Sequence, residues 1–338
     1  MGKILADFLN VLRKQYKYNM NQLHLVGFSL STHIMGVVGR RLRDGGNPVR
    51  QITALDPAGP CFFKDNEFSH KYTLTPDAAR LVVARHYNFG RYGSRRPIGG
   101  VDIYVNGGHD QPPLNEGIQG RVRSALGLNS HIAAVYHEVG SAVDSSCYDM
   151  AYECDSYEDY LDGACAKCSD GGDTCYHSGT LINGANRNRM PKYRLDTQMY
   201  TRMGGDKYCL HQYQLVVQLK ERPGKVLESA FSGDKVRLNL SSGQVVAPNR
   251  KATCDESIVY TKLVASEEDL SDMRQIIIDI DEPEANAAQL KKIESIRLNY
   301  MSHPFEDRRR AKSLAFCPSS TSPRSFSQCS IPERGETC

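Results

Sequence analysis

The chain has 338 residues, 40% of them hydrophobic, which is long enough for two ordinary domains that each bury a core. Its 42 basic and 39 acidic residues nearly balance, and this argues against a nucleic-acid partner held through its phosphate backbone. The sequence contains no run of about twenty apolar residues, so we expect no transmembrane helix.

The N-terminal segment, MGKILADFLNVLRKQY, predicts an amphipathic helix because its apolar positions recur at helical spacing. Charged residues occur throughout it, unlike in a secretory signal peptide. The eleven cysteines of the chain nevertheless favour an oxidising compartment. We therefore expect a secreted, extracellular protein whose true N-terminus, with its signal peptide, lies upstream of Met1.

The next segments alternate between strand and helix patterns. Residues 22–26 form a short apolar run typical of a strand, and a helical stretch follows to about Arg43. After a turn rich in glycine, Gln51–Leu55 has the pattern of a second strand. This order predicts a parallel crossover unit.

Two later patterns extend this α/β region. Val101–Val105 is a strand candidate, and Asn129 with Ser130 is expected to cap a helix that runs to about Val143. The sequence therefore predicts α/β architecture up to about residue 185.

From Tyr193 onward the pattern changes to short runs, most of them alternating or β-branched, between turns rich in Gly, Asp and Ser. The runs are residues 212–219, 235–240, 257–260, 274–280 and 295–300. This spacing predicts a β-sandwich. We place the domain boundary near residue 186, in the polar loop 183–189, which gives domains of residues 1–185 and 186–338.

Gly27-Phe-Ser-Leu-Ser31 lies between a predicted strand and a predicted helix, which is the context of a nucleophile elbow. In such an elbow Ser29 is held in a strained turn, and small neighbours allow other chain segments to approach closely. The usual last glycine of the motif is Ser31 here. A plain strand-to-helix turn would also explain a motif this short.

A serine nucleophile needs a base and a carboxylate that orients the base, and α/β hydrolases carry them in the order Ser, Asp, His. Asp56 directly follows the strand Gln51–Leu55, where its side chain could reach an imidazole beside Ser29. An aspartate before Pro57 can also simply initiate a turn.

Ten histidines are candidates for the base. His131 lies downstream of both partners, at the start of a predicted helix. His137 is its main rival, but it lies within the helix, where a half-buried structural residue is expected. His24 should point to the flank of the sheet, and His86 and His109 could each be a structural hydrogen-bonding residue.

Four ordered motifs together resemble the catalytic domain of the pancreatic and lipoprotein lipase family: VGFSLSTHIMGVVGRR, ITALDPAGPCF, GGVDIYVNGGHDQPP and NSHIAAVYHEVGSAV. The resemblance implies Ser29 as nucleophile, Asp56 as the triad acid and His131 as the base. It also implies that the backbone N–H of Leu30 is one oxyanion donor.

The same resemblance implies what the protein does. It indicates a secreted serine carboxylic ester hydrolase that releases fatty acids from acylglycerols or phospholipids at a micelle, emulsion or membrane surface. The C-terminal runs resemble the family's lipid-associated β-sandwich domain.

The cysteine-rich stretch after the catalytic motifs resembles the double-disulfide loop of the family. It implies that Cys154 pairs with Cys165 and that Cys168 pairs with Cys175. Cys165-Ala-Lys-Cys168 could instead be redox-active or half of a zinc site, but no partner pair at zinc spacing follows.

The chain departs from the family at its start. Family members carry several strands and a helix before the nucleophile strand, including the loop that supplies a second oxyanion N–H. We therefore expect an incomplete α/β hydrolase, lacking its N-terminal strands, followed by an all-β sandwich. One oxyanion donor contributes about 2.7–4 kcal/mol to the transition state. The missing strands would also expose one side of the remaining sheet to solvent, so we expect this chain to be poorly folded or inactive. The alternatives to an enzyme are a non-catalytic lipid-binding or storage relative and an inactive truncated product.

Two further departures concern loops. The segment from Pro112 to Leu128, where the family usually has a disulfide-bounded lid, is short and has no cysteine. A short lid indicates a site that depends less on interfacial opening, as in phospholipase-like members. At residues 72–79, which match the calcium loop, Asp77 is the only acidic residue, so we expect no bound metal and no cofactor.

The basic triplet Arg308–Arg310 could bind a heparin-like polyanion. Because Glu306 and Asp307 precede it, a solvated surface turn fits the sequence better.

Overall fold

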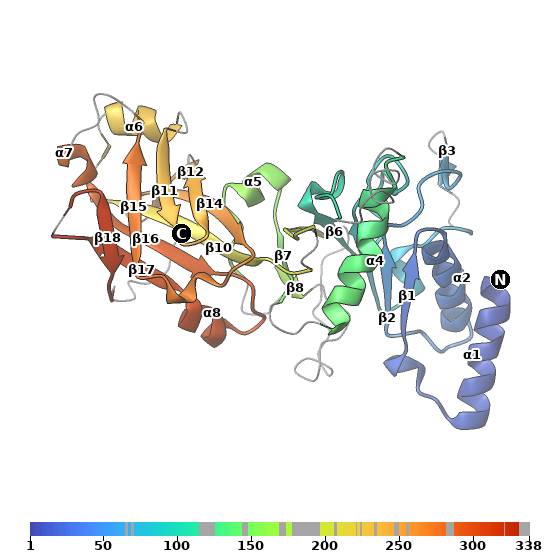
Figure 1. The fold of residues 1–338 in the computed structure, drawn as a ribbon. Helices are drawn as coiled ribbons and strands as arrows, with labels where there is room; N and C mark the ends of the chain where they lie inside the picture. Colours follow the sequence, from blue (N-terminus) through green and yellow to red (C-terminus); the bar gives the residue numbers. More distant parts are fainter. Residues whose placement is uncertain are drawn as a thin grey trace. The chain divides into compact units, whose positions relative to one another are not determined.

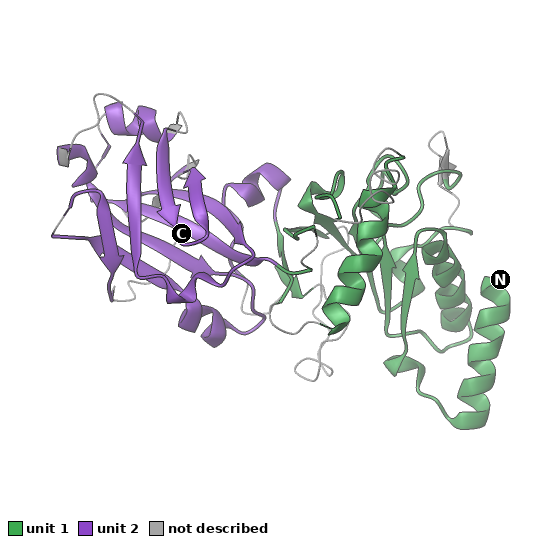
Figure 2. Ribbon diagram, in the orientation of Figure 1, with its two compact units in different colours: residues 1–153, 168–209 green, residues 154–167, 210–338 purple. Residues whose placement is uncertain are grey.

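The computed structural model forms two compact units, Met1–Glu153 with Cys168–Cys209, and Cys154–Lys167 with Leu210–Cys338 (Figure 2). The boundary expected near residue 186 lies outside the described residues and stays a prediction. The described residues are 1–64, 67–68, 71–114, 126–143, 148–168, 174–177, 197–205, 208–220, 222–223, 225–232, 235–246, 250–254, 257–281, 287–320 and 322–330.

The first unit contains a seven-stranded mixed sheet (Figure 1). In sheet order its strands are β1 His24–Phe28, β2 Gln51–Leu55, β5 Leu81–His86, β6 Val101–Val105, β9 Thr197–Thr201, β7 Met150–Glu153 and β8 Cys175–His177. The first five are parallel, and the last two run antiparallel to their neighbours. Parallel strands bring their carboxyl ends to one edge of the sheet, and this edge receives the predicted site residues.

The crossover unit predicted from the sequence is present, with one correction at a helix start. The helices of this unit are α1 Gly2–Tyr16, α2 Leu30–Asp44 and α4 Leu128–Val143, with 3₁₀ turns η1 Met20–Gln22, η2 Pro76–Ala78 and η3 Asn106–Gly108 and the short pair β3 Phe63–Lys64 and β4 Glu67–Phe68. Asn129 and Ser130 do not cap α4, because the helix already begins at Leu128. Ser130 Oγ instead accepts a hydrogen bond from the backbone N–H of Gln111 at 3.0 Å.

Both faces of the parallel sheet are buried. Ile52 and Val82 face the core that contains side chains of α1 and α2. Leu55 and Val83 face the opposite core, where Ala133 of α4 packs. Strands covered on both faces are near-continuous apolar runs. In β5, with the sequence LVVARH, the run is ended by Arg85 and His86, and for this reason the sequence did not predict the strand.

The second unit contains a nine-stranded antiparallel sheet, which confirms the all-β character expected of this region. In sheet order its strands are β12 Gly243–Val246, β11 Val236–Leu240, β15 Gln275–Ile280, β18 Ser325–Gln328, β17 Leu314–Pro318, β16 Ile293–Tyr300, β10 His211–Leu219, β14 Ser257–Ser266 and β13 Arg250–Cys254. Leu238, Tyr260 and Ile296, from separate parts of this order, belong to one core. The described strands therefore form one hydrogen-bonded order that shares a single core, and the finer expectation of a β-sandwich stays a prediction.

The short helices of this unit are α5 Tyr157–Leu161, α6 Lys225–Ser232, α7 Ala287–Leu290 and α8 Glu306–Lys312, with the 3₁₀ turn η4 Leu270–Asp272. The basic triplet Arg308–Arg310 lies in α8, where the sequence predicts a turn, and Arg310 pairs with Glu306 at 2.6 Å. Within the described residues, no helix is long and apolar enough to cross a membrane.

Three disulfides join described cysteines: Cys154–Cys165, Cys168–Cys175 and Cys317–Cys329. The first two are the pairs that the family resemblance implies. Because Cys165 and Cys168 belong to different disulfides, neither a redox-active dithiol nor half of a zinc site is present between them. The third disulfide, Cys317–Cys329, was not expected, because the family resemblance concerned only the cysteine-rich stretch 154–175.

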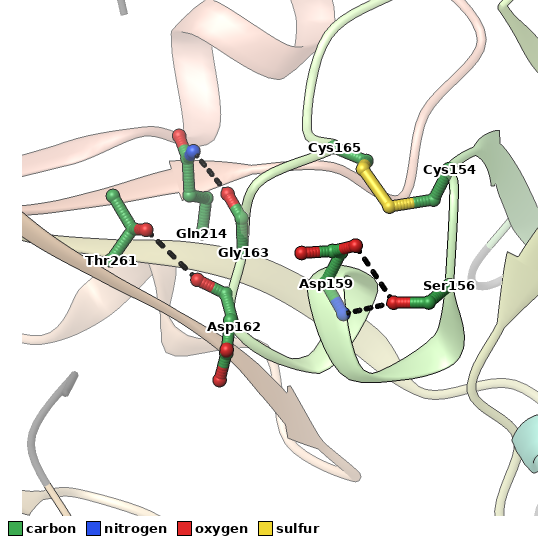
Figure 3. Close-up of a disulfide and its surroundings, with 8 residues drawn as sticks. All are labelled: Cys154, Ser156, Asp159, Asp162, Gly163, Cys165, Gln214 and Thr261. Atoms are coloured by element: carbon green, nitrogen blue, oxygen red, sulfur yellow. Dashed lines mark hydrogen bonds between the residues drawn. A yellow bond between two sulfur atoms is a disulfide. The ribbon is translucent and has the colours of Figure 1, made fainter. Parts of the chain in front are cut away.

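The loop closed by the first disulfide, Cys154–Cys165, packs on the all-β unit (Figure 3). Gln214 Nε2 donates a hydrogen bond to the carbonyl of Gly163 at 2.7 Å. Thr261 Oγ1 donates to the carbonyl of Asp162 at 2.8 Å. These contacts to β10 and β14 explain why this loop belongs to the second unit although its sequence neighbours belong to the first.

Candidate active site

Ser29 occupies the sharp turn between β1 and α2, with φ 53° and ψ −121°. A non-glycine residue in this region carries strain of about 1–3 kcal/mol and persists only where the surroundings enforce it. Gly27 shows how tight the turn is, because a Cβ placed there would lie 2.9 Å from the backbone nitrogen of Thr32. The first glycine of the motif is therefore required by the close approach of the helix.

Backbone hydrogen bonds hold Ser29 on both sides. Its N–H donates to the carbonyl of Leu55 in β2 at 2.9 Å. Its carbonyl accepts bonds from the N–H of Thr32 at 3.2 Å, from Thr32 Oγ1 at 2.7 Å and from the N–H of Ala58 at 3.3 Å. The strained conformation is thus fixed by the neighbouring strand, the helix and the loop after β2.

Leu30 is the first residue of α2. The first N–H groups of a helix have no intrahelical partner, and they form the positive end of the helix dipole. The Leu30 N–H therefore has the character required of an oxyanion donor beside Ser29.

Asp56 follows the last residue of β2 and is fully buried. Its Oδ1 accepts hydrogen bonds from the backbone N–H groups of Tyr87 at 2.8 Å and Asn88 at 3.0 Å. Both donors come directly after β5, the next strand in the sheet. Gly93 leaves room for this carboxylate, because a Cβ there would lie 2.6 Å from Oδ1. The second carboxylate oxygen remains for another partner.

That partner is His131, in the first turn of α4, whose Nδ1 lies 2.5 Å from Asp56 Oδ2. An ionised carboxylate only accepts hydrogen bonds, so Nδ1 carries the proton and Nε2 is left to accept one. The imidazole side chain is 8% exposed and contacts two aromatic rings, with centroids 4.6 Å from Phe28 and 5.5 Å from Tyr92. Its orientation is therefore fixed by both polar and aromatic contacts.

The structure joins two of the three predicted triad residues directly. Asp56 and His131 are hydrogen-bonded, and Ser29 lies at the end of β1, whose neighbour β2 leads into Asp56. Among the described residues, no hydrogen bond joins the Ser29 hydroxyl to His131. Catalytic hydrogen bonds are often long without substrate and tighten in the reacting complex, so this geometry suits a resting site.

A buried ion pair anchors the helix that carries His131. Arg85, fully buried in β5, pairs with Glu138 of α4 at 2.9 Å and with Asp149 at 3.4 Å. Asp149 Oδ1 also accepts a hydrogen bond from Thr201 Oγ1 at 2.5 Å. Burial raises the pKa of Asp149 to about 6, against the lowering effect of Arg85. The pairing of these residues, like β5 itself, was not predictable from any local sequence pattern.

The four other histidines weighed as the base make separate contacts. His86 Nε2 pairs with the buried carboxylate of Asp102 at 2.7 Å, and His24 Nε2 lies 2.8 Å from Thr53 Oγ1. His137 Nε2 bonds the carbonyl of Gly204 at 3.1 Å, and exposed His109 lies 3.3 Å from the Phe89 carbonyl. None of these interactions involves Ser29 or Asp56.

The expected lid lies mostly outside the described residues, whereas the stretch that matches the calcium loop is described. Residues 115–125, the middle of the expected short lid, lie outside the described residues. Asp77, in the stretch matching the calcium loop, is engaged by Arg43 and by Thr75 Oγ1. Its carboxylate thus has protein partners in this structure.

Residues 1–202 match the lipase family. The lipoprotein lipase of Mus musculus is 31% identical over 247 residues, which cover 68% of this chain and 49% of the mouse protein. The lipoprotein lipases of Neovison vison and Homo sapiens are 33% and 32% identical over 213 residues, which cover 59% of this chain and 43% of each relative. The chain thus spans about half the length of the curated relatives it matches.

Proposed function

Because the chain belongs to the pancreatic and lipoprotein lipase family, we propose that its first unit carries the active site of a serine carboxylic ester hydrolase that acts on lipid esters. The observation that carries the proposal is the buried hydrogen bond between Asp56 and His131 at 2.5 Å. Its partner in the reaction is Ser29, which the backbone holds at a strained strand-to-helix turn. A purely structural serine has no need for such strain.

The first half of the proposed reaction forms an acyl-enzyme. His131 Nε2 takes the proton from Ser29 Oγ as the oxygen attacks the ester carbonyl carbon. The carbonyl oxygen becomes negative, and the Leu30 N–H stabilises it. The imidazolium then gives its proton to the leaving alcohol, so the C–O bond breaks and the acyl group stays on Ser29. Asp56 stabilises the imidazolium and keeps Nδ1 protonated.

The second half releases the fatty acid. His131 Nε2 takes a proton from a water molecule as the water oxygen attacks the acyl carbon. The intermediate collapses, Ser29 Oγ leaves with the proton returned from the imidazolium, and a carboxylic acid is produced. These steps use only side chains and water, so the proposal includes no metal or cofactor.

The proposed substrates are acylglycerols or phospholipids at a micelle, emulsion or membrane surface, in an extracellular setting. The relatives that match this chain are lipoprotein lipases, which supports a lipid substrate. The three disulfides support an oxidising compartment. Triolein emulsion and phosphatidylcholine vesicles, compared in one assay of fatty acid release, distinguish the two substrate classes.

The proposal is tested with the soluble ester p-nitrophenyl butyrate and a fluorophosphonate probe. The Asp56–His131 pair is assembled in the structure, so we expect the chain to hydrolyse this activated ester, in place of the inactivity expected from the missing oxyanion donor. We also expect labelling at Ser29, and we expect Ser29→Ala to abolish both. His131→Ala should also abolish hydrolysis, whereas the matched control His109→Ala, which changes an exposed imidazole outside the site, should retain it.

The competing hypothesis is a lipid-binding relative without catalysis. It predicts that the chain binds phosphatidylcholine vesicles while Ser29 remains unlabelled and Ser29→Ala changes nothing. Equal rates of hydrolysis by the wild type and by Ser29→Ala would likewise contradict the proposal that Ser29 is the nucleophile.

A further inference from the structure

Ser31 stands where the nucleophile-elbow motif usually ends in glycine, and its hydroxyl is bonded to the strand before the nucleophile. Ser31 Oγ accepts a hydrogen bond from the backbone N–H of Phe28 at 2.7 Å. The same oxygen donates to the backbone carbonyl of Phe28, also at 2.7 Å. A hydroxyl has one proton to donate and lone pairs to accept with, so both bonds can exist together.

These two bonds satisfy backbone polar groups of Phe28 at the edge of the sheet. In the described strand order, β1 is an edge strand and pairs with β2 alone. The Ser29 N–H points to β2, so the Phe28 carbonyl of the same planar peptide points the opposite way. The Ser31 hydroxyl therefore binds the two polar groups that a neighbouring strand would bind in the interior of a sheet.

Phe28 links this contact to the reacting groups. It is the last residue of β1, so its carbonyl belongs to the peptide that enters Ser29. Its ring lies against the imidazole of His131, with centroids 4.6 Å apart. A shift or twist at Phe28 would thus move both the nucleophile and the aromatic support of the base.

We propose that the Ser31 hydroxyl is a positioning residue that fixes Phe28, and through it the Ser29 nucleophile and the His131 ring, in the geometry for ester attack. This proposal rests on the proposed function. It assigns a purpose to the departure from the glycine motif, because neither glycine nor alanine at this position can form either bond.

The kinetic test compares the full chain with Ser31→Ala, Ser31→Gly and Ser31→Thr. With p-nitrophenyl butyrate we expect kcat to fall about 10-fold in the alanine and glycine variants with KM unchanged, because a misplaced nucleophile weakens the transition state alone. Ser31→Thr retains the hydroxyl and should restore most of kcat. The fluorophosphonate probe should label Ser29 about 10-fold more slowly in Ser31→Ala, but to the same final extent.

Ser313→Ala is a matched control. Ser313 Oγ makes the same kind of double contact in the other unit, accepting from the Tyr300 N–H at 3.0 Å and donating to the Arg309 carbonyl at 2.9 Å. Loss of this hydroxyl should leave kcat and the labelling rate unchanged. A merely structural role for Ser31 would instead lower the final labelled fraction of Ser31→Ala without slowing the labelling of the remainder.

Hydrogen exchange supplies a measurement that does not depend on activity. The Phe28 amide proton should exchange about 10-fold faster in Ser31→Ala than in the wild type, and the Ser29 amide should change less because it bonds to Leu55. An unchanged Phe28 rate would overturn the proposal. Unchanged kcat and labelling rate in Ser31→Ala, with an active wild type, would overturn it and leave the proposed function standing. A wild type that neither hydrolyses nor is labelled would overturn the proposed function, and the positioning role with it.

Discussion

Among single residues, Asp56 determines the geometry of the proposed site most strongly. Its two oxygens are used differently: Oδ1 accepts two backbone N–H groups, and Oδ2 accepts the His131 proton. The backbone contacts fix the carboxylate, and the carboxylate fixes the tautomer of the imidazole. A substitution that keeps the side-chain position of Asp56 but removes its negative charge can therefore test the role of the charge alone.

Asp56→Asn keeps the shape and the acceptor for the N–H groups of Tyr87 and Asn88. It presents an NH₂ group to His131 Nδ1, which favours the tautomer that cannot accept the Ser29 proton. We expect kcat for p-nitrophenyl butyrate to fall by about four orders of magnitude, as tautomer reversal does in serine hydrolases. Far-ultraviolet circular dichroism should remain unchanged.

Asp110→Asn is the control for this variant, because Asp110 is exposed and lies outside the site. It should retain wild-type kcat. If Asp56→Asn also retained it, Asp56 would be only a turn residue before Pro57.

The three proposed triad residues were predictable from the sequence, but the residues that hold them in place were not. Ser29, Asp56 and His131 have recognisable side-chain types in a recognisable order. The donors to Asp56 are backbone N–H groups of Tyr87 and Asn88, which any residue type could supply. Their position follows from the placement of β5 in the sheet, and no local pattern states it.

Among helices and strands, the sequence predicts those whose pattern is complete within a few neighbouring residues. Gln51–Leu55 and Val101–Val105 were predicted with the observed bounds, since each is an apolar run between turns. β5 was missed because Arg85 and His86 interrupt its apolar run. Both side chains are buried only because distant carboxylates pair with them. In the second unit, the pairing of β17 with β18, supported by Cys317–Cys329, is likewise set by long-range contacts.

The loop Cys154–Cys165 gives an element-scale prediction. Replacing both of its cysteines by serine removes the constraint on the unfolded chain and should destabilise the second unit by about 3 kcal/mol, which calorimetry would measure as a lower Tm. Hydrolysis of p-nitrophenyl butyrate at 25 °C should persist, because the loop contains no proposed catalytic residue.

Cys61→Ser is the matched control for this loop, since Cys61 is a free, exposed cysteine. Its Tm should equal that of the wild type. A double variant with the same Tm as this control would show that the loop contributes no stability.

At the scale of the whole molecule, buried ionisable groups couple stability to pH. Burial, and then the charge of Arg85, lower the pKa of His137 to about 3. The folded chain thus keeps this imidazole neutral at pH values where the unfolded chain protonates it. A lowered histidine pKa contributes stability above about pH 6.5 that is lost as the pH falls toward 3.

Asp149 acts in the opposite direction, because burial raises its pKa to about 6. The folded state holds a proton that the unfolded state has released, so this contribution is lost as pH rises from about 4 to 6. The two slopes offset each other in the wild type, and a variant is needed to separate them.

His137→Gln isolates the histidine contribution. Between pH 6 and pH 4 the stability of the wild type relative to this variant should fall by about 1.4 kcal/mol per pH unit, measured by urea unfolding. Above about pH 7.5 the relative stability should be nearly independent of pH. A relative stability that stays constant from pH 6 to pH 4 would show that His137 takes up its proton equally in the folded and unfolded chain.

The proposed reaction passes through a covalent bond between the acyl group and Ser29 Oγ, and this bond can be trapped. The chain is mixed with p-nitrophenyl butyrate, quenched in acid during turnover and analysed by peptide mass spectrometry. We predict a butyryl group on Ser29 in the wild type and no modified peptide in Ser29→Ala. Ester hydrolysis without acylation of Ser29, or acylation of another residue at wild-type rate in Ser29→Ala, would contradict the account.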